Sequence, residues 1–105
     1  CLFVYTEAEW KKIAEGLGSG WAKADQRGIH RFIYGGAQDL NVDSVGRILI
    51  PEHLKKFAEL KNRVVFAGVN NRIEIWSEQK WQIYKKTMEK RAEELSEKLG
   101  DAGAF

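Results

Sequence analysis

The sequence has little of several features that would assign it to a special class of protein. Its 105 residues include one cysteine, Cys1, and one proline, Pro51. A single cysteine excludes a disulfide within the chain and is typical of a reducing compartment. No apolar run approaches the roughly 20 residues that a membrane-spanning helix needs. No signal peptide is visible either, because the first apolar residues are followed at once by charged ones.

An excess of one charge is also lacking. Lys and Arg number 17 against 15 Asp and Glu, so the formal net charge is only +2. Hydrophobic residues make up 44% and charged residues 30% of the chain, as in an ordinary globular domain with a modest core. A basic surface that seeks an acidic partner therefore requires the positive charges to gather on one side of the molecule.

Groups suited to catalysis or metal binding are sparse as well. The two histidines, His30 and His53, are isolated, and no Ser or Cys pairs with a His in the pattern of a nucleophilic enzyme. Glu93 and Glu94 fit a solvated helix face better than an acid–base pair. The sequence therefore predicts no enzyme, no metal site and no cofactor.

The hydrophobic pattern predicts a mixed α and β chain. Apolar residues at helical spacing indicate helices at 6–17, 24–34, 52–60 and 77–99. Alternating apolar residues indicate strands at 1–5, 38–42, 47–50, 63–69 and 72–76, of which the last four form two hairpins. Inward positions are expected at Leu54, Phe57, Ala58 and Leu60. Gly16, Gly18 and Gly20 follow a helix rather than a strand, which favours a helix end and linker over a nucleotide-binding loop.

The segment from Asp43 to Pro51 is the most informative part of the chain. It places a polar turn with Asp43, Gly46 and Arg47 before a short apolar strand that Pro51 stops. Asp and Gly favour turns, and Arg is a planar, always-charged donor able to bind phosphate or a base edge. Two interpretations stay open for the segment alone: an ordinary hairpin turn with a solvated arginine, or a nucleic-acid-reading tip.

An internal repeat links the two ends of the chain. Residues 1–10 and 72–81 match after a shift of 71, each with a strand, a hydroxyl N-cap, an acidic residue and a helical Trp. The matched pairs are Leu2 with Ile73, Val4 with Ile75, Tyr5 with Trp76, Thr6 with Ser77, Glu7 with Glu78, and Trp10 with Trp81. If 38–81 is one complete unit, the equivalent turn of an earlier unit is expected roughly 28 residues before Cys1. We therefore expect the chain to be an N-terminally truncated fragment.

These features together resemble the MraZ family of bacterial transcriptional regulators, which are built from two SpoVT/AbrB-type units. The resemblance covers essentially the whole chain. The residues that carry it are Asp43, Gly46 and Arg47 of an Asp-x-x-Gly-Arg signature, the Ile-Leu-Ile-Pro run at 48–51, the segments 31–37 and 68–76, and Trp81. The first unit's own Asp-x-x-Gly-Arg is absent from this sequence.

The resemblance implies an α+β fold, a swapped-hairpin AbrB-like β-barrel with flanking helices and a long C-terminal helix. It divides the chain into four parts: 1–10 as the C-terminal remnant of the first unit, 11–37 as a helical connector, 38–81 as the second unit, and 82–105 as the C-terminal helix and tail. It also implies no cofactor.

The function implied by the resemblance is sequence-specific binding of double-stranded DNA. The expected sites are direct repeats upstream of a promoter of the division and cell-wall gene cluster. They are bound by a homo-oligomer in the form of a ring, in the cytoplasm on the nucleoid. The family's DNA-contacting arginine corresponds to Arg47, with Asp43 and Gly46 shaping its turn, and basic residues that approach DNA correspond to Lys55 and Lys56. Neither a membrane nor a small-molecule substrate is implied.

Two alternatives remain at this stage. Lys55 and Lys56 also fit plain solvated helix lysines. The whole chain also fits a protein-interaction or oligomerisation module of AbrB-like fold that does not bind DNA, for which the four tryptophans are the main argument. Trp10 and Trp81 lie on inward helix stripes and fit a core, whereas Trp21 lies in the linker and fits a contact with a neighbouring subunit.

Overall fold

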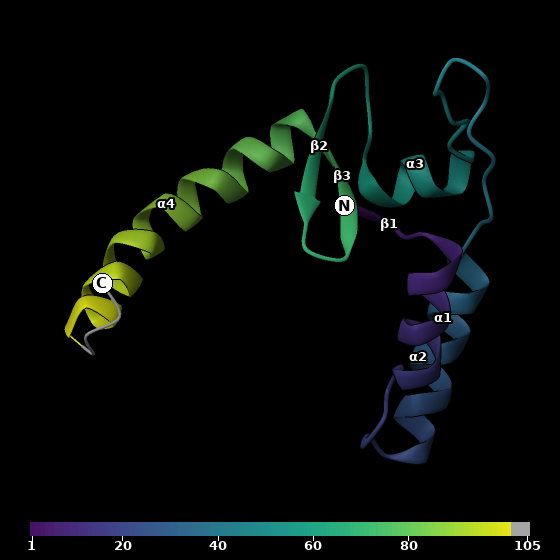
Figure 1. Ribbon diagram of the computed structural model, residues 1–105, viewed down its shortest axis with the longest axis horizontal. Coiled ribbons are helices and arrows are strands. Elements are labelled where there is room, and N and C mark those ends of the chain that lie inside the picture. Colours follow the sequence, from purple (N-terminus) through teal and green to yellow (C-terminus); the bar gives the residue numbers. More distant parts are fainter. Residues whose placement is uncertain (102–105) are drawn as a thin grey trace.

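The computed structural model describes residues 1–101, and for residues 98–101 it describes the backbone alone. The elements in chain order are β1 (Leu2–Val4), α1 (Glu7–Gly16), α2 (Lys23–Gly36), α3 (Glu52–Ala58), β2 (Val64–Val69), β3 (Arg72–Ser77) and α4 (Glu78–Asp101) (Figure 1). The predicted mixed α+β class is therefore confirmed. The loose tail is expected at 100–105, but α4 continues to Asp101. The rest of that tail, 102–105, and the side chain of Leu99 lie outside the described residues.

The three strands form one antiparallel sheet in the order β1-β3-β2. β2 and β3 are the predicted second hairpin, paired from Val64 with Ser77 to Val69 with Arg72. Asn70 takes a positive φ of 49° in the turn between them, a conformation that Asn tolerates better than most residues. The sequence prediction of this hairpin is confirmed.

The two repeat segments pair with each other in a symmetric register. In the β1–β3 ladder Leu2 lies opposite Ile75 and Val4 opposite Ile73, with Phe3 opposite Glu74. Phe3 and Glu74 are repeat equivalents under the shift of 71, so the ladder has a local twofold axis between them. The two repeat-equivalent strands thus pair with each other, and a rotation about this axis places each strand on the other.

The helices that follow these strands begin in the same way. The Thr6 hydroxyl accepts the backbone N–H of Glu9 at 3.2 Å, and the Ser77 hydroxyl accepts that of Lys80 at 3.1 Å. Each hydroxyl thus satisfies one of the free N–H groups at a helix start. Equivalent aromatic pairs also recur, with ring centroids 6.2 Å apart for Tyr5 and Trp10 and 5.5 Å apart for Trp76 and Trp81. The structure therefore supports the repeat in strand, cap and packing.

The core lies where α3 covers the sheet beside β1. Leu2, Ala58 and Ile75 are buried there, and the half-buried side chains packed around them are Val4, Ile48, Ile50, Leu54 and Leu60. The prediction that Phe57 points inward is wrong, because Phe57 is 59% exposed and its ring lies 5.9 Å from that of Phe32. Consecutive residues of an α-helix point about 100° apart, so the orientation that buries Ala58 directs Phe57 away from the core.

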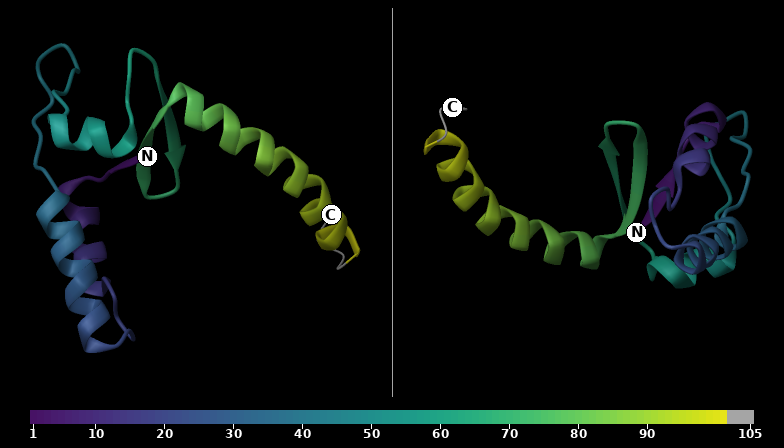
Figure 2. Two further views of the ribbon diagram at one scale, coloured as in Figure 1. Left: turned by 180° about the vertical axis from the view of Figure 1, so that it is seen from behind. Right: turned by 90° about the horizontal axis from the view of Figure 1, so that it is seen from below.

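α1 and α2 form an antiparallel helical hairpin that extends away from the sheet (Figures 1 and 2). The linker between them turns at Gly18 and Gly20, with φ of 74° and 87°, which confirms the predicted helix end and linker. α2 runs two residues beyond the expected end, to Gly36, because a glycine inside a helix costs only about 1 kcal/mol and does not stop it. The ring of Trp10 packs against that of Tyr34 at 5.8 Å and joins the two helices.

The predicted first hairpin is wrong as a secondary-structure assignment. Neither 38–42 nor 47–50 is a strand, and residues 37–51 form a loop that contains the expected turn. Among the described residues, the one backbone-to-backbone hydrogen bond that joins 38–43 to 47–50 runs from the Asp43 N–H to the Arg47 carbonyl, at 2.9 Å. A strand needs a neighbouring edge to satisfy its backbone groups, and this segment has none in the described chain.

α4 leaves the sheet at Ser77 and projects from the body as one long helix (Figures 1 and 2). Its first turns rest on β2 and β3, where Trp76 contacts Trp81 and Tyr84. Across the described part of the chain, no helix combines the length and apolar character that crossing a membrane would require.

Candidate functional site

The loop between α2 and α3 is organised by one carboxylate. Asp43 Oδ1 accepts the backbone N–H of Val45 at 2.9 Å and that of Arg47 at 2.8 Å. The Asp43 carbonyl accepts the N–H of Gly46 at 3.1 Å, and the Asp43 N–H donates to the Arg47 carbonyl at 2.9 Å. An Asp at the start of a turn is suited to these bonds. The loop tip is therefore closed on itself without support from a sheet.

Gly46 gives this tip its backbone shape. Its φ is +87°, a region that residues with a Cβ rarely adopt. A Cβ built on Gly46 would meet no atom within 4 Å, so the requirement for glycine is one of backbone conformation and not of space. The expectation that Asp43 and Gly46 form a turn agrees with this geometry.

Arg47 carries an exposed guanidinium at the end of the tip. Its Nε donates to Asp43 Oδ2 at 3.1 Å, and its side chain is 75% exposed. An ion pair this exposed contributes little to stability, but it restricts the direction of the side chain. Among the residues the structure describes, the two Nη groups have no acceptor, so the outer edge of the guanidinium is open to an external ligand.

The pKa of Asp43 is lowered from its ordinary value. The main cause is the hydrogen bond from the backbone N–H of Arg47, and the bonds from Val45, the Arg47 side chain and Gly46 act in the same direction. Desolvation opposes them and is outweighed. The carboxylate is therefore ionised at neutral pH and holds the Arg47 side chain as its charge partner.

Apolar side chains around the tip are exposed to an unusual degree. Val42 is 66%, Val45 71% and Leu49 83% exposed, although the neighbouring Ile48 is half-buried on the core. Exposed apolar residues on one short segment indicate a contact surface. Asn41, Asp43, Arg47, Ile48 and Leu49 line a shallow hollow beside the tip.

Lys55 and Lys56 lie on α3, which begins directly after Pro51 at the end of the loop. Lys55 Nζ lies 3.5 Å from Glu52 Oε2 on the same helix, and Lys56 is exposed. The two lysines and Arg47 thus belong to consecutive segments of the chain, and the structure brings neither lysine into the Asp43 network. Both lysines are accessible to a ligand that covers α3.

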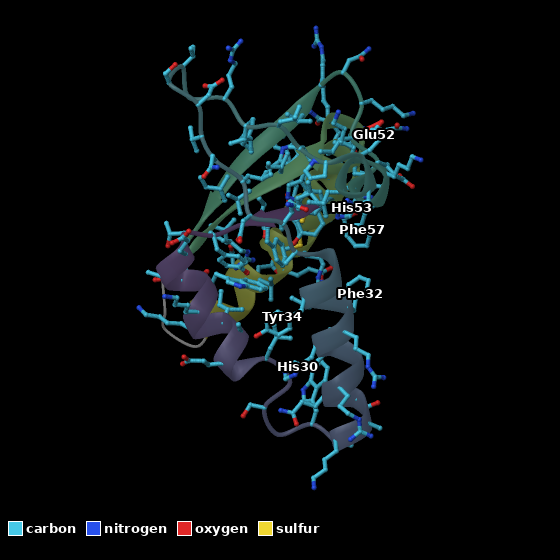
Figure 3. All side chains as sticks on the ribbon, turned by 90° about the vertical axis from the view of Figure 1, so that its right-hand side faces the viewer. His30, Phe32, Tyr34, Glu52, His53 and Phe57 are labelled. Atoms are coloured by element: carbon cyan, nitrogen blue, oxygen red, sulfur yellow. The ribbon has the colours of Figure 1, made fainter. Side chains whose placement is uncertain are left out.

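α3 also faces the end of α2, as the side chains in Figure 3 show. His53 Nε2 lies 3.4 Å from the Gly36 carbonyl, next to the contact between Phe32 and Phe57. Farther along α2, His30 Nε2 lies 2.7 Å from the Leu17 carbonyl. Both histidines thus have structural partners, and the described residues contain no group of three or more His, Cys, Asp or Glu able to hold a metal ion.

Sequence reasoning missed a polar cluster on the sheet. Glu74 is 8% exposed and accepts hydrogen bonds from Arg72 Nε at 2.9 Å and from Trp76 Nε1 at 3.0 Å. The Arg72 guanidinium also lies 4.7 Å from the centre of the Phe3 ring. The alternation Arg-Ile-Glu-Ile-Trp, which places these three side chains on one face of β3, was the signal that could have revealed it.

Comparisons with known proteins agree on one family. A family model described as "MraZ protein, putative antitoxin-like" matches residues 33–101, a range that includes the loop, α3, the hairpin and α4. "Transcriptional regulator MraZ" of Heliobacterium modesticaldum is 43% identical over 102 residues, covering 96% of this chain and 71% of that protein. The protein of the same name from Caldanaerobacter subterraneus subsp. tengcongensis is 45% identical over 100 residues, covering 94% and 70%.

Proposed function

The chain belongs to the MraZ family of transcriptional regulators, and we propose that it acts by binding repeated DNA sites through the 43–47 loop. Arg47 is the residue to which we assign base recognition. Asp43 and Gly46 keep the tip in the shape that presents it. The observation that carries this proposal is the guanidinium held at Nε by Asp43 and open at its outer edge.

The chemistry of Arg47 suits a DNA major groove. The groove is about 12 Å wide, enough for a narrow loop tip, and a guanidinium binds the O6 and N7 acceptors of guanine with two parallel hydrogen bonds. Orientation by Asp43 lowers the entropy lost when those bonds form. Val45, exposed beside Arg47, is placed for apolar contact with a thymine methyl group.

Lys55 and Lys56 supply phosphate contacts in this proposal. Such contacts add affinity and salt dependence without sequence information. A single loop and two lysines make few contacts, so useful affinity requires several copies of the loop on one homo-oligomer, a ring, meeting direct repeats in the DNA. The net charge of +2 is compatible with this arrangement, because only the DNA-facing side needs to be basic.

We further propose that the loop becomes a strand pair in the assembled protein. Its exposed apolar residues and open backbone groups suit pairing with an equivalent segment, which would complete the swapped-hairpin barrel. The local twofold axis between Phe3 and Glu74 supports a two-unit organisation. In this proposal 38–81 is one SpoVT/AbrB-type unit, 1–10 closes the other, 11–37 connects them and 82–105 forms the C-terminal helix and tail.

The regulated genes are, in this proposal, those of the division and cell-wall cluster, and the protein acts in the cytoplasm on the nucleoid. Fluorescence anisotropy with a duplex carrying the direct repeats upstream of that cluster, and with a shuffled duplex, tests the proposal. The chain should prefer the repeats and lose affinity as salt rises from about 50 to 200 mM. Arg47→Ala should weaken binding to the repeats roughly 10- to 100-fold, the cost of losing a bidentate base contact.

Arg27→Ala is the matched control, because Arg27 is an exposed arginine on α2, away from the loop, and its removal changes the charge equally. If Arg47→Ala and Arg27→Ala lose equal affinity for the repeats, Arg47 contributes only nonspecific positive charge and does not recognise bases. If the unaltered chain binds repeated and shuffled DNA equally well, the result would instead support the alternative of a protein-interaction or oligomerisation module without specific DNA binding.

A further inference from the structure

The apolar stripe of α4 continues beyond the point where the body covers it. Its residues lie at spacings of three and four along the helix: Trp81, Tyr84, Met88, Ala92 and Leu95. Trp81 and Tyr84 contact Trp76 on the sheet, with ring centroids 5.5 and 5.0 Å away. α4 packs on β2 and β3 at its start, where Lys80 also pairs with Glu59 and Glu78 with Arg63. Figure 1 shows the rest of the helix projecting from the body. Leu95 is 42% exposed.

The stripe is straight. Trp81 to Ala92 and Tyr84 to Leu95 are both steps of 11 residues, and 11 residues make nearly three whole turns of an α-helix. A second helix is therefore able to follow the stripe with almost no supercoiling. From Trp81 to Leu95 the stripe is about 21 Å long, since each residue advances about 1.5 Å.

The charges of α4 separate along its length. Before Met88 the charged residues of α4 are Glu78, Lys80, Lys85 and Lys86, which give this half a net positive charge. After Met88, up to residue 97, they are Glu89, Lys90, Arg91, Glu93, Glu94 and Glu97, which give this half a net negative charge. A partner of one charge sign, such as a DNA backbone or an anionic membrane, would suit only one half. A parallel copy of the helix would place like charges side by side. An antiparallel copy places each basic half beside an acidic half.

We propose that α4 pairs antiparallel with α4 of a second copy of this chain, with the twofold axis at Met88. In that register Trp81 faces Leu95 of the second copy, and the large Tyr84 faces the small Ala92. Met88 faces its own counterpart. Alternation of large and small side chains across a helix pair is what close packing requires.

Flanking charges suit the same register. With Met88 on the axis, Lys85 and Glu89 lie on one flank of the stripe, and each Lys85 comes beside Glu89 of the second copy, twice per pair. The two residues form no ion pair within the described chain. In this register the second half of α4 of the second copy packs against the aromatic cluster of Trp76, Trp81 and Tyr84.

This pairing goes beyond the proposed function, since it assigns a contact surface outside the loop and concerns no DNA contact. The two proposals are therefore able to fail separately. The first test uses disulfide formation in the full chain with Cys1→Ser as background, because a disulfide needs Cα atoms about 4.4 to 6.8 Å apart. Met88→Cys should form a covalent dimer on mild oxidation, and Lys86→Cys, on the opposite side of α4, should not.

Ala92→Cys distinguishes the direction of the pair. In the antiparallel register two Ala92 positions lie eight residues apart, or about 12 Å, so Ala92→Cys alone should not cross-link. Mixed with Tyr84→Cys it should give a mixed dimer. Equal cross-linking of Met88→Cys and Ala92→Cys would show a parallel pair and overturn the proposal. So would equal cross-linking of Met88→Cys and Lys86→Cys, which indicates random collision.

A charge exchange tests the same register without cysteines. Lys85→Glu or Glu89→Lys alone places like charges side by side at both Lys85–Glu89 positions of the pair, and should weaken association at least roughly 10-fold. An equimolar mixture should form mixed pairs in preference to either homodimer, because each variant then meets the opposite charge. Native mass spectrometry resolves the three species by mass. A statistical 1:2:1 distribution in the mixture would contradict the proposal.

Discussion

Asp43 holds Arg47 from two sides. One carboxylate oxygen accepts the backbone N–H of Arg47 at 2.8 Å, and the other accepts Nε of its side chain at 3.1 Å. The group that closes the turn therefore also directs the guanidinium. We conclude that the Asp43 carboxylate sets both the shape of the loop tip and the orientation of the Arg47 side chain, so a substitution of Asp43 should alter both.

Acid should open the loop only below the pH at which an ordinary aspartate protonates. The Arg47 N–H is the largest cause of the lowered pKa of Asp43. Because the pKa is depressed in the folded chain, the stability from the carboxylate is fully present above the unfolded-state pKa. It is lost as the pH falls through the folded-state pKa. A carbon-13 NMR titration of the Asp43 carboxyl group measures this.

Arg47→Ala sharpens that titration. The substitution removes the side-chain bond to Asp43 but keeps the backbone N–H bonds from residues 45 and 47, which include the largest cause. The pKa of Asp43 should therefore rise only part of the way to its ordinary value. A complete return would show that the arginine charge, and not the backbone of the turn, stabilises the carboxylate.

Gly46→Ala should weaken DNA binding while the chain stays folded. A residue with a Cβ at this φ of +87° is strained by about 1 to 2 kcal/mol, although no atom blocks the methyl group. The loop should therefore lose its closed form, with roughly 5- to 30-fold weaker binding by anisotropy. Gly28→Ala, at an open position inside α2, is the control and should leave binding unchanged. Equal affinity of Gly46→Ala and the unaltered chain would contradict the role of the turn.

Local signals in the sequence predicted most of the elements. Asn70 and Asn71 separate two apolar runs, which is a strong hairpin signal, and the β2–β3 ladder formed as expected. Thr6 and Ser77 marked two helix starts by their hydroxyl groups. Turn geometry at Asp43 and Gly46 was predictable for the same reason, because short-range bonds determine it.

Features that depend on distant partners were not predictable. Apolar and polar residues alternate over 38–42, as they do in a strand. This pattern indicates that one face becomes buried, but it does not show which strand would pair with the segment. Phe57 has helical spacing with Leu54, yet Ala58 takes the buried position against the sheet. The role of Glu74 depends on Arg72 and Trp76 adopting particular rotamers, which spacing alone does not specify.

Glu74→Gln should destabilise the sheet by about 1 to 3 kcal/mol, the cost of leaving a buried polar group poorly paired. The substitution removes the charge that faces Arg72, whose Nη2 lies 2.8 Å from Glu74 Oε2. Urea unfolding followed by circular dichroism measures the loss. Glu15→Gln, at an exposed position of α1, is the control and should change the free energy of unfolding by less than about 0.5 kcal/mol. Similar values for the two variants would show that the buried cluster does not stabilise the sheet.

Ser77→Ala should destabilise the chain by about 1 kcal/mol, because the Ser77 hydroxyl accepts the N–H of Lys80 at the start of α4. Ser77 is 6% exposed, so water cannot readily replace that bond. Thr6→Ala at the equivalent position should cost less, since its hydrogen bond is exposed. Ser96→Ala, on the exposed face of the same helix, is the matched control and should be neutral or slightly stabilising because Ala favours helix. Urea unfolding and helicity at 222 nm measure all three variants. If Ser77→Ala and Ser96→Ala lower the free energy of unfolding equally, the Ser77 cap does not stabilise α4. The contacts of Trp81 and Tyr84 with Trp76 would then be what positions the start of the helix.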